Sequence, residues 1–240
     1  MVARALVIEH EAGAGPGWFR SWLEAAGIAV DIARPYTGET LPDEIGQDAL
    51  VVLGGPMGAY DDERAPWLPA TRELLRHAVD AGVPTLGLCL GGQLLATACG
   101  GRVERGSRGP EVGVVRLVLD AGGDPLLGYL PTTVPVTEWH FDAITELPPG
   151  AAPLASSATY PYQAFRLGNS AWGLQGHPEV TASAVAGWAR DTAETLGSLG
   201  IDAASAANEV AAREDELTGV WSRVARNFAE LGLTHEIPAT

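Results

Sequence analysis

A cysteine lies among small residues in the segment 87–93, whose sequence is GLCLGGQ. The apolar run before it predicts a buried strand, and the residues after it predict a helix. A thiol on such a tight strand-to-helix turn needs glycine neighbours, so that the backbone fits and a substrate can approach. The positive end of the helix dipole would favour the thiolate. We therefore predict that Cys89 is a nucleophile and that the Leu90 N–H donates to an oxyanion.

A histidine and a glutamate two residues apart follow another strand-like run. Pro178 biases His177 toward an extended conformation, in which alternate side chains share a face. Glu179 can therefore orient the His177 imidazole and leave its other nitrogen for a thiol. A nucleophile, a base and a group that orients the base form the general pattern of an activated cysteine. This pattern predicts that Cys89, His177 and Glu179 are catalytic.

A glycine-rich turn with the sequence GGPMG occupies residues 54–58, directly after a strand-like run. A turn at this edge of an open α/β sheet can bind phosphate or line an oxyanion hole. No Lys-Ser or Lys-Thr follows it, and it does not match GxGxxG, so nucleotide binding is not predicted.

Strand-like and helical segments, which must position these residues, alternate in the first half of the chain. Four strand-like runs are separated by amphipathic segments of helical spacing at residues 18–26, 66–81 and 91–99. This alternation predicts an α/β fold, an open, mostly parallel twisted sheet with helices on both faces.

Beyond residue 100, strand-like runs are separated by Gly, Pro and Ser turns. Helical patterns return at residues 182–196 and from 201 to about 231. We expect a domain over 1–198 and a helical C-terminal extension over 199–240, packed on the domain or at an oligomer interface.

Composition narrows the classes of partner. The net charge of −15 argues against nucleic acid and anionic membranes, because phosphates would be repelled. No apolar stretch approaches the length of a membrane span, and no signal peptide is apparent. The two cysteines are too few for a disulfide framework and are expected to be free thiols in a reducing, cytoplasmic compartment. The spacing of the histidines and cysteines predicts no metal site, and no cofactor is expected.

Four segments together resemble the class I glutamine amidotransferase family, especially the glutaminase domain of GMP synthetase and its stand-alone relatives: GGPMGAYD, the GxCxGxQ elbow, EWHFD and GLQGHPEV. The resemblance covers residues 3–188. It implies the same roles for Cys89, His177 and Glu179, and oxyanion donors at Gly55 and Leu90. It also implies that the substrate pocket contains Gln93, Trp139, His140, Phe141 and Asp142. The implied reaction releases ammonia from glutamine, leaves a γ-glutamyl thioester on Cys89 and hydrolyses it to glutamate.

Two positions depart from this family. The residue before the catalytic histidine is usually aromatic and here is Gly176, whereas Phe141 stands where glycine is usual. We hypothesise that the Phe141 ring fills the space of the missing aromatic, so that the pocket wall is reshaped.

Several functional alternatives stay open. The chain could pass ammonia to a separate acceptor enzyme, or act as a γ-glutamyl hydrolase or transferase on amides other than glutamine. It could also be a non-catalytic binding module on the same fold. A homodimer is possible.

Overall fold

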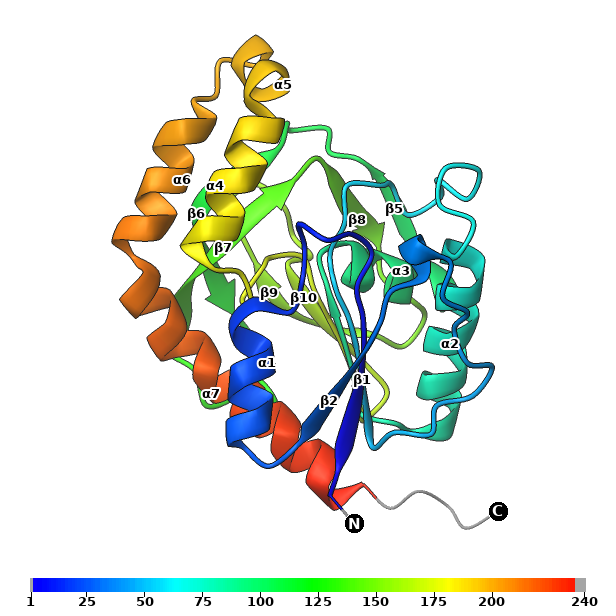
Figure 1. The fold of residues 1–240 in the computed structure, drawn as a ribbon. Coiled ribbons are helices and arrows are strands. Elements are labelled where there is room, and N and C mark those ends of the chain that lie inside the picture. Colours follow the sequence, from blue (N-terminus) through cyan, green and yellow to red (C-terminus); the bar gives the residue numbers. More distant parts are fainter. Residues whose placement is uncertain (1, 236–240) are drawn as a thin grey trace.

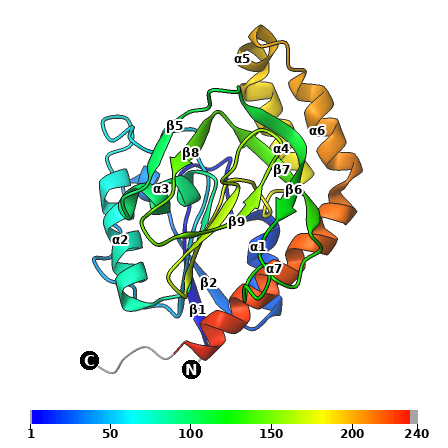
Figure 2. The same cartoon turned by 180° about the vertical axis from the view of Figure 1, so that it is seen from behind.

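A nine-stranded mixed sheet forms the centre of the computed structural model, which describes residues 2–235, and helices cover both of its faces (Figures 1 and 2). The strand order is β2-β1-β3-β4-β11-β10-β9-β6-β7. The first five strands in this order pair in parallel: β2 (Ala29–Ala33), β1 (Arg4–Ile8), β3 (Ala49–Val52), β4 (Thr85–Leu88) and β11 (Ala171–Leu174). The predicted open α/β sheet with helices on both faces is confirmed.

The other half of the sheet is antiparallel. It consists of β10 (Ala164–Leu167), β9 (Ala152–Ser156), β6 (Glu111–Leu119) and β7 (Thr133–His140). A separate two-stranded sheet pairs β5 (Arg102–Arg105) with β8 (Asp142–Glu146). Short turns can join antiparallel strands, whereas parallel strands need helical crossovers, which accounts for the turn-rich sequence of this half.

Two hydrophobic cores sandwich the parallel strands, whose side chains are buried on both faces as this arrangement requires. One core contains α1 (Gly17–Ala25) and α7 (Glu214–Thr234), with Phe19, Trp221 and Phe228 buried. The other contains α2 (Leu68–Ala81) and α3 (Leu90–Ala98), and a short 3-10 helix, η1 (Pro35–Thr37), lies in the loop after β2. A third cluster packs α4 (Ala182–Asp191), α5 (Ala193–Ser198) and α6 (Ala203–Ala212) beside β6 and β7.

Two predicted continuous helices are each broken at one residue. The segment 182–196 divides at Thr192, whose hydroxyl donates to the carbonyl of Trp188 and accepts from the Trp139 indole N–H at 3.3 Å. The segment from residue 201 divides at Arg213, where φ is −115°. The break at Arg213 lets α6 lie along β6 while α7 turns to cross α1 and β7 (Figure 1).

The apolar face of α7 packs against the same chain. Trp221, Val224 and Phe228 are buried, and the Trp221 indole N–H donates to the carbonyl of Pro135 on β7 at 2.8 Å. The boundary near residue 198 and an oligomer interface stay predictions. None of the helices within residues 2–235 is both long and apolar enough to cross a bilayer.

Candidate active site

Cys89 connects β4 to α3 in a strained conformation. Its φ and ψ are 49° and −110°, and no other non-glycine residue in the described chain has a positive φ. Close backbone contacts explain the neighbouring glycines, because a Cβ on Gly91 would overlap the carbonyl of Val52. A Cβ on Gly87 would overlap the carbonyl of Gly91. The sequence prediction of a tight, glycine-flanked turn is thus confirmed, and such strain is typical of functional sites.

The pairing of β4 with β11 brings the second motif to the cysteine. The N–H of Cys89 donates to the carbonyl of Leu174 at the end of β11, at 2.8 Å. The next residue, Gln175, donates from its amide to the Cys89 sulfur at 3.7 Å. Gly54 lies beside both motifs, since a Cβ there would be 2.7 Å from Cε1 of His177 and 3.5 Å from Cβ of Cys89. The strand ends therefore bring Cys89 and His177 together.

His177 and Glu179 form a buried pair, with 2.9 Å between Nδ1 and Oε1. Burial by itself lowers the pKa of His177, but the charges of Cys89 and Glu179 and hydrogen bonds to both raise that pKa well above its usual value. A protonated imidazole in this position would stabilise a thiolate on Cys89. The two residues predicted to orient and to act as base are thus arranged as the general pattern requires.

Elements distant in the sequence hold the backbone of Glu179. Its carbonyl accepts from the Trp18 N–H at 2.7 Å, and a Cβ on Gly17 would overlap the same carbonyl. Glu214, the first residue of α7, accepts from the Ala182 N–H at 3.0 Å and from the Trp18 indole at 3.4 Å. The start of α1 and the start of α7 therefore both support the segment that carries Glu179.

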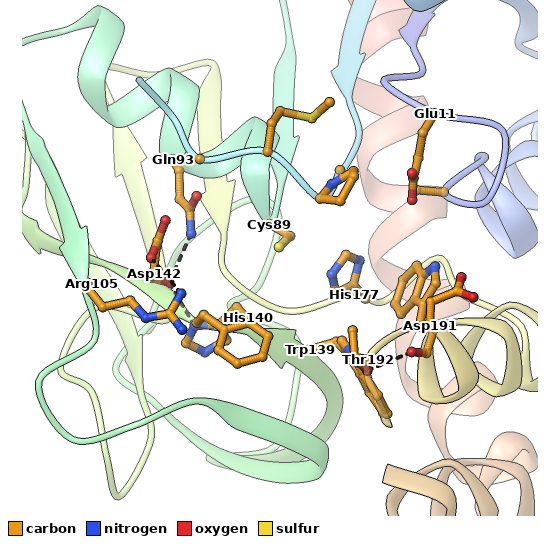
Figure 3. Close-up of a pocket in the computed structure, with 17 residues that line it drawn as sticks. Glu11, Cys89, Gln93, Arg105, Trp139, His140, Asp142, His177, Asp191 and Thr192 are labelled. Atoms are coloured by element: carbon orange, nitrogen blue, oxygen red, sulfur yellow. Dashed lines mark hydrogen bonds and ion pairs between the residues drawn. The ribbon is translucent and has the colours of Figure 1, made fainter. Parts of the chain in front are cut away.

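A cavity of about 300 Å³ opens above Cys89 (Figure 3). Most of the predicted site residues line it: Gly55, Cys89, Gln93, Trp139, His140, Phe141, Asp142 and His177. Leu90 begins α3, where backbone N–H groups have no acceptor within the helix, and Glu179 lies behind His177.

The polar groups of two predicted substrate-binding residues are partly occupied within the protein. The Gln93 amide nitrogen donates to the carbonyl of Asp142 at 3.0 Å and to Oε1 of Gln175 at 3.2 Å, which leaves its oxygen for a ligand. Nδ1 of His140 faces the carbonyl of Asp142 at 2.8 Å, and its Nε2 faces Oε2 of Glu111 at 3.2 Å. Both nitrogens of His140 have acceptors, so this residue offers the cavity mainly its ring.

Among the residues that sequence reasoning missed are Gln175, whose amide contacts the Cys89 sulfur, and Glu11, Arg105 and Trp188, which line the cavity. Gln175 belongs to the motif GLQGHPEV, so its position two residues before His177 could have identified it as a site residue. The other three come from the loop after β1, from β5 and from α4, and no local pattern connects these segments.

The hypothesis that Phe141 replaces the aromatic ring absent at position 176 is wrong. A Cβ on Gly176 would lie 2.6 Å from Oε1 of Glu138 and 2.6 Å from Cγ2 of Val136, so these side chains fill the space. Phe141 instead lines the cavity, with the Arg105 guanidinium 4.5 Å from its ring centroid. Glu138 is fully buried, and both its burial and the charge of Glu111 raise its pKa well above the usual value.

Comparisons with known proteins identify the family of this chain. The family model for glutamine amidotransferase class-I matches residues 19–187. A glutamine amidotransferase-like protein of Salmonella typhimurium, YfeJ, is 33% identical over 199 residues, 80% of this chain and 82% of that protein. Gamma-glutamyl peptidase 3 of Arabidopsis thaliana is 29% identical over 67% of each chain. A solved glutamine amidotransferase structure from Methylobacillus flagellatus superposes with a TM-score of 0.85 at 31% identity and covers 100% of this chain and 98% of that one. The chain therefore belongs to the class I glutamine amidotransferase family.

Proposed function

We propose that this chain hydrolyses γ-glutamyl amides, glutamine among them, through a covalent thioester on Cys89. The observation that carries the proposal is the strained Cys89 beside a buried His177, whose Nδ1 lies 2.9 Å from Glu179. Membership of the family supports the same chemistry.

In the first half of the reaction, the Cys89 thiolate attacks the γ-carbonyl carbon and the oxygen becomes an oxyanion. The backbone N–H groups of Gly55 and Leu90 are proposed to donate to it. When the C–N bond breaks, protonated His177 gives its proton to the leaving nitrogen, and a γ-glutamyl thioester remains on Cys89. Neutral His177 then takes a proton from water, which attacks the thioester and releases glutamate and the thiolate.

Proposed contacts with the γ-glutamyl part involve the end of the cavity lined by Gln93 and Asp142. Arg105 lies 3.5 Å from Asp142 at this end, so a cation and an anion stand side by side. An α-amino acid carries the same two charges on neighbouring groups, which supports binding of the glutamyl zwitterion here. Trp139, His140 and Phe141 would form the wall.

A second candidate function is cleavage of γ-glutamyl amides with leaving groups larger than ammonia. The similarity to a gamma-glutamyl peptidase favours it. Delivery of ammonia to a separate acceptor enzyme is the other possibility. Assaying the chain alone with glutamine separates autonomous glutamine hydrolysis, which gives rapid turnover, from both of these alternatives, which give near silence.

Replacement of the nucleophile tests the proposal. Cys89→Ser is expected to lower kcat by several orders of magnitude while the protein stays folded, because the change is nearly isosteric. Cys99→Ser is the matched control, since Cys99 is the other free cysteine and lies half-buried at the far end of α3. Retained activity in Cys89→Ser, or a comparable loss in Cys99→Ser, would contradict the assignment of Cys89 as the nucleophile.

A further inference from the structure

The cavity at Cys89 continues past His177, away from the proposed glutamyl end (Figure 3). A general acid must reach the leaving nitrogen, so any substituent on that nitrogen lies on the His177 side of the sulfur. Ammonia has only one non-hydrogen atom, so it needs no additional binding surface as a leaving group. The residues beyond His177 therefore bear on which leaving groups fit.

An aromatic side chain forms the wall directly beyond His177. The Trp188 ring centroid lies 4.7 Å from that of His177, and its indole N–H donates to the carbonyl of Gly13 at 3.0 Å. The bond to Gly13 ties α4 to the loop after β1 and orients the ring along the cavity. Aromatic faces attract both alkyl chains and cations.

Two carboxylates lie at the same end, Glu11 from the loop after β1 and Asp191 one helical turn beyond Trp188 (Figure 3). Burial and the negative charge of Asp191 raise the pKa of Glu11, and the charge of Arg64 opposes this shift. The carboxylates thus repel each other across the cavity, and a cation bound between them would remove this repulsion. The glutamyl end, in contrast, contains Arg105.

We infer that the end of the cavity lined by Trp188, Glu11 and Asp191 is a leaving-group subsite for amines that carry a second, positively charged nitrogen. The substrate class is then the mono-γ-glutamyl amides of aliphatic diamines, a selectivity that rests on the proposed function. The alkyl chain would lie along Trp188, and the distal ammonium would reach the two carboxylates. Attack by Cys89 and protonation by His177 would release the diamine and leave the γ-glutamyl thioester, which water hydrolyses.

A pair of substrates of matched shape isolates the charge. We would compare kcat/KM for the mono-γ-glutamyl amide of 1,4-diaminobutane with that of pentylamine, in which a methyl group replaces the distal ammonium. The wild-type chain should prefer the charged amide by about tenfold, as expected for two partly exposed carboxylates and one aromatic face. This preference should decrease as salt is added. γ-Glutamylglycine, whose leaving group is anionic, should be the poorest of the three.

Charge-removing variants assign the preference to this subsite. In the double variant Glu11→Gln with Asp191→Asn, the ratio of the two kcat/KM values should fall to within about threefold of unity, since only the contact with the distal ammonium is lost. The double variant Asp80→Asn with Glu230→Gln removes the same number of exposed charges on α2 and α7 and should keep the tenfold ratio. An equal preference in wild type, or an unchanged ratio in the first variant, would overturn the inference.

Binding measurements separate failure of this inference from failure of the proposed function. Calorimetry with Cys89→Ser gives the affinity for each amide without turnover. If no amide is hydrolysed but the diamine amide binds about tenfold more tightly, the reaction is wrong and the subsite is supported. If both amides are hydrolysed and bind equally, the reaction is supported and the cationic subsite is wrong. Equal binding without hydrolysis contradicts both.

Discussion

At the scale of single residues, the site depends on groups that charge or position one another. Glu179 touches His177 rather than the cavity, and its second carboxylate oxygen is buried without a hydrogen-bond partner among the described residues. Glu138 lies fully buried nearby, although neither of its oxygens makes a hydrogen bond within residues 2–235. Glu179 thus contacts the histidine, while burial and the charge of Glu111 raise the pKa of Glu138 well above its usual value.

Replacing Glu179 with glutamine should lower kcat by about 10³- to 10⁴-fold and change KM little, because orientation and charging of His177 would be lost while substrate contacts remain. His177→Ala is the comparison and should cost more. Steady-state kinetics on glutamine and on a γ-glutamyl amide measure both parameters. A loss expressed mainly in KM would place Glu179 in the substrate pocket instead.

Replacing Glu138 with glutamine should stabilise the protein increasingly as pH rises. Because the pKa of Glu138 in the folded state is raised above 4.5, the folded state binds more protons than the unfolded state at pH values between the two. The stability that Glu138 contributes is fully present below about pH 4.5 and is lost as pH rises toward the folded pKa. Glutamine cannot ionise, so the Tm of the variant minus that of wild type should grow from pH 4.5 to 8.

Thermal denaturation across this pH range measures the difference. Glu230→Gln, at an exposed position of α7, controls for the removal of one negative charge. A Tm difference for Glu138→Gln that is constant or shrinks with pH would contradict the prediction.

The proximity of Cys89, His177 and Glu179 could be predicted because each lies in a short motif at the end of a strand-like run. The role of Glu138 could not. Its burial follows from Gly176, which leaves room for the carboxylate, and the two positions are 38 residues apart, one on β7 and the other just after β11. A glutamate next to a tryptophan in a strand-like run gives no sign of a raised pKa, because the shift depends on desolvation in the folded protein.

At the scale of elements, the backbones around the site pack very closely. α3 lies so close to β3 that Gly91 touches the carbonyl of Val52. The sequence predicted the elbow and the parallel sheet, since both have local patterns. It did not predict the breaks at Thr192 and Arg213, because neither break interrupts the helical spacing of the sequence.

Two glycine-to-alanine changes within helices should have opposite effects. Gly91→Ala should destabilise the protein severely or prevent folding, because its Cβ would overlap the Val52 carbonyl. Gly219→Ala in α7 meets no atom within 4 Å and should stabilise by about 0.4–1 kcal/mol through the reduced entropy of the unfolded chain. Chemical denaturation measures both. If both changes alter the unfolding free energy equally and mildly, the backbone around Cys89 can adjust to the added methyl group.

At the scale of the whole molecule, α7 closes the core beside α1. Trp221 is almost completely buried and binds the carbonyl of Pro135, whereas Leu233 on the same helix is 49% exposed. The spacing of apolar residues predicted the face of this helix but not its partner, because periodicity records which side is buried and not what covers it.

Trp221→Ala should therefore cost about 3–5 kcal/mol of unfolding free energy, the usual cost of deleting a large buried aromatic side chain. Leu233→Ala should stay within about 0.5 kcal/mol. Denaturation by urea measures both. A small effect at Trp221 would indicate that α7 is held chiefly by contacts other than its apolar face.

The contact of Glu214 with Ala182 and Trp18 has a consequence for synthesis on the ribosome. Every residue that lines the cavity precedes α7 in the chain, so all of them are translated before this support exists. A nascent polypeptide halted before residue 214 would contain Cys89, His177 and Glu179, but the segment around Glu179 would be held by Trp18 alone and not by Glu214. The contact between α7 and this segment can therefore form only after the whole cavity lining has been translated.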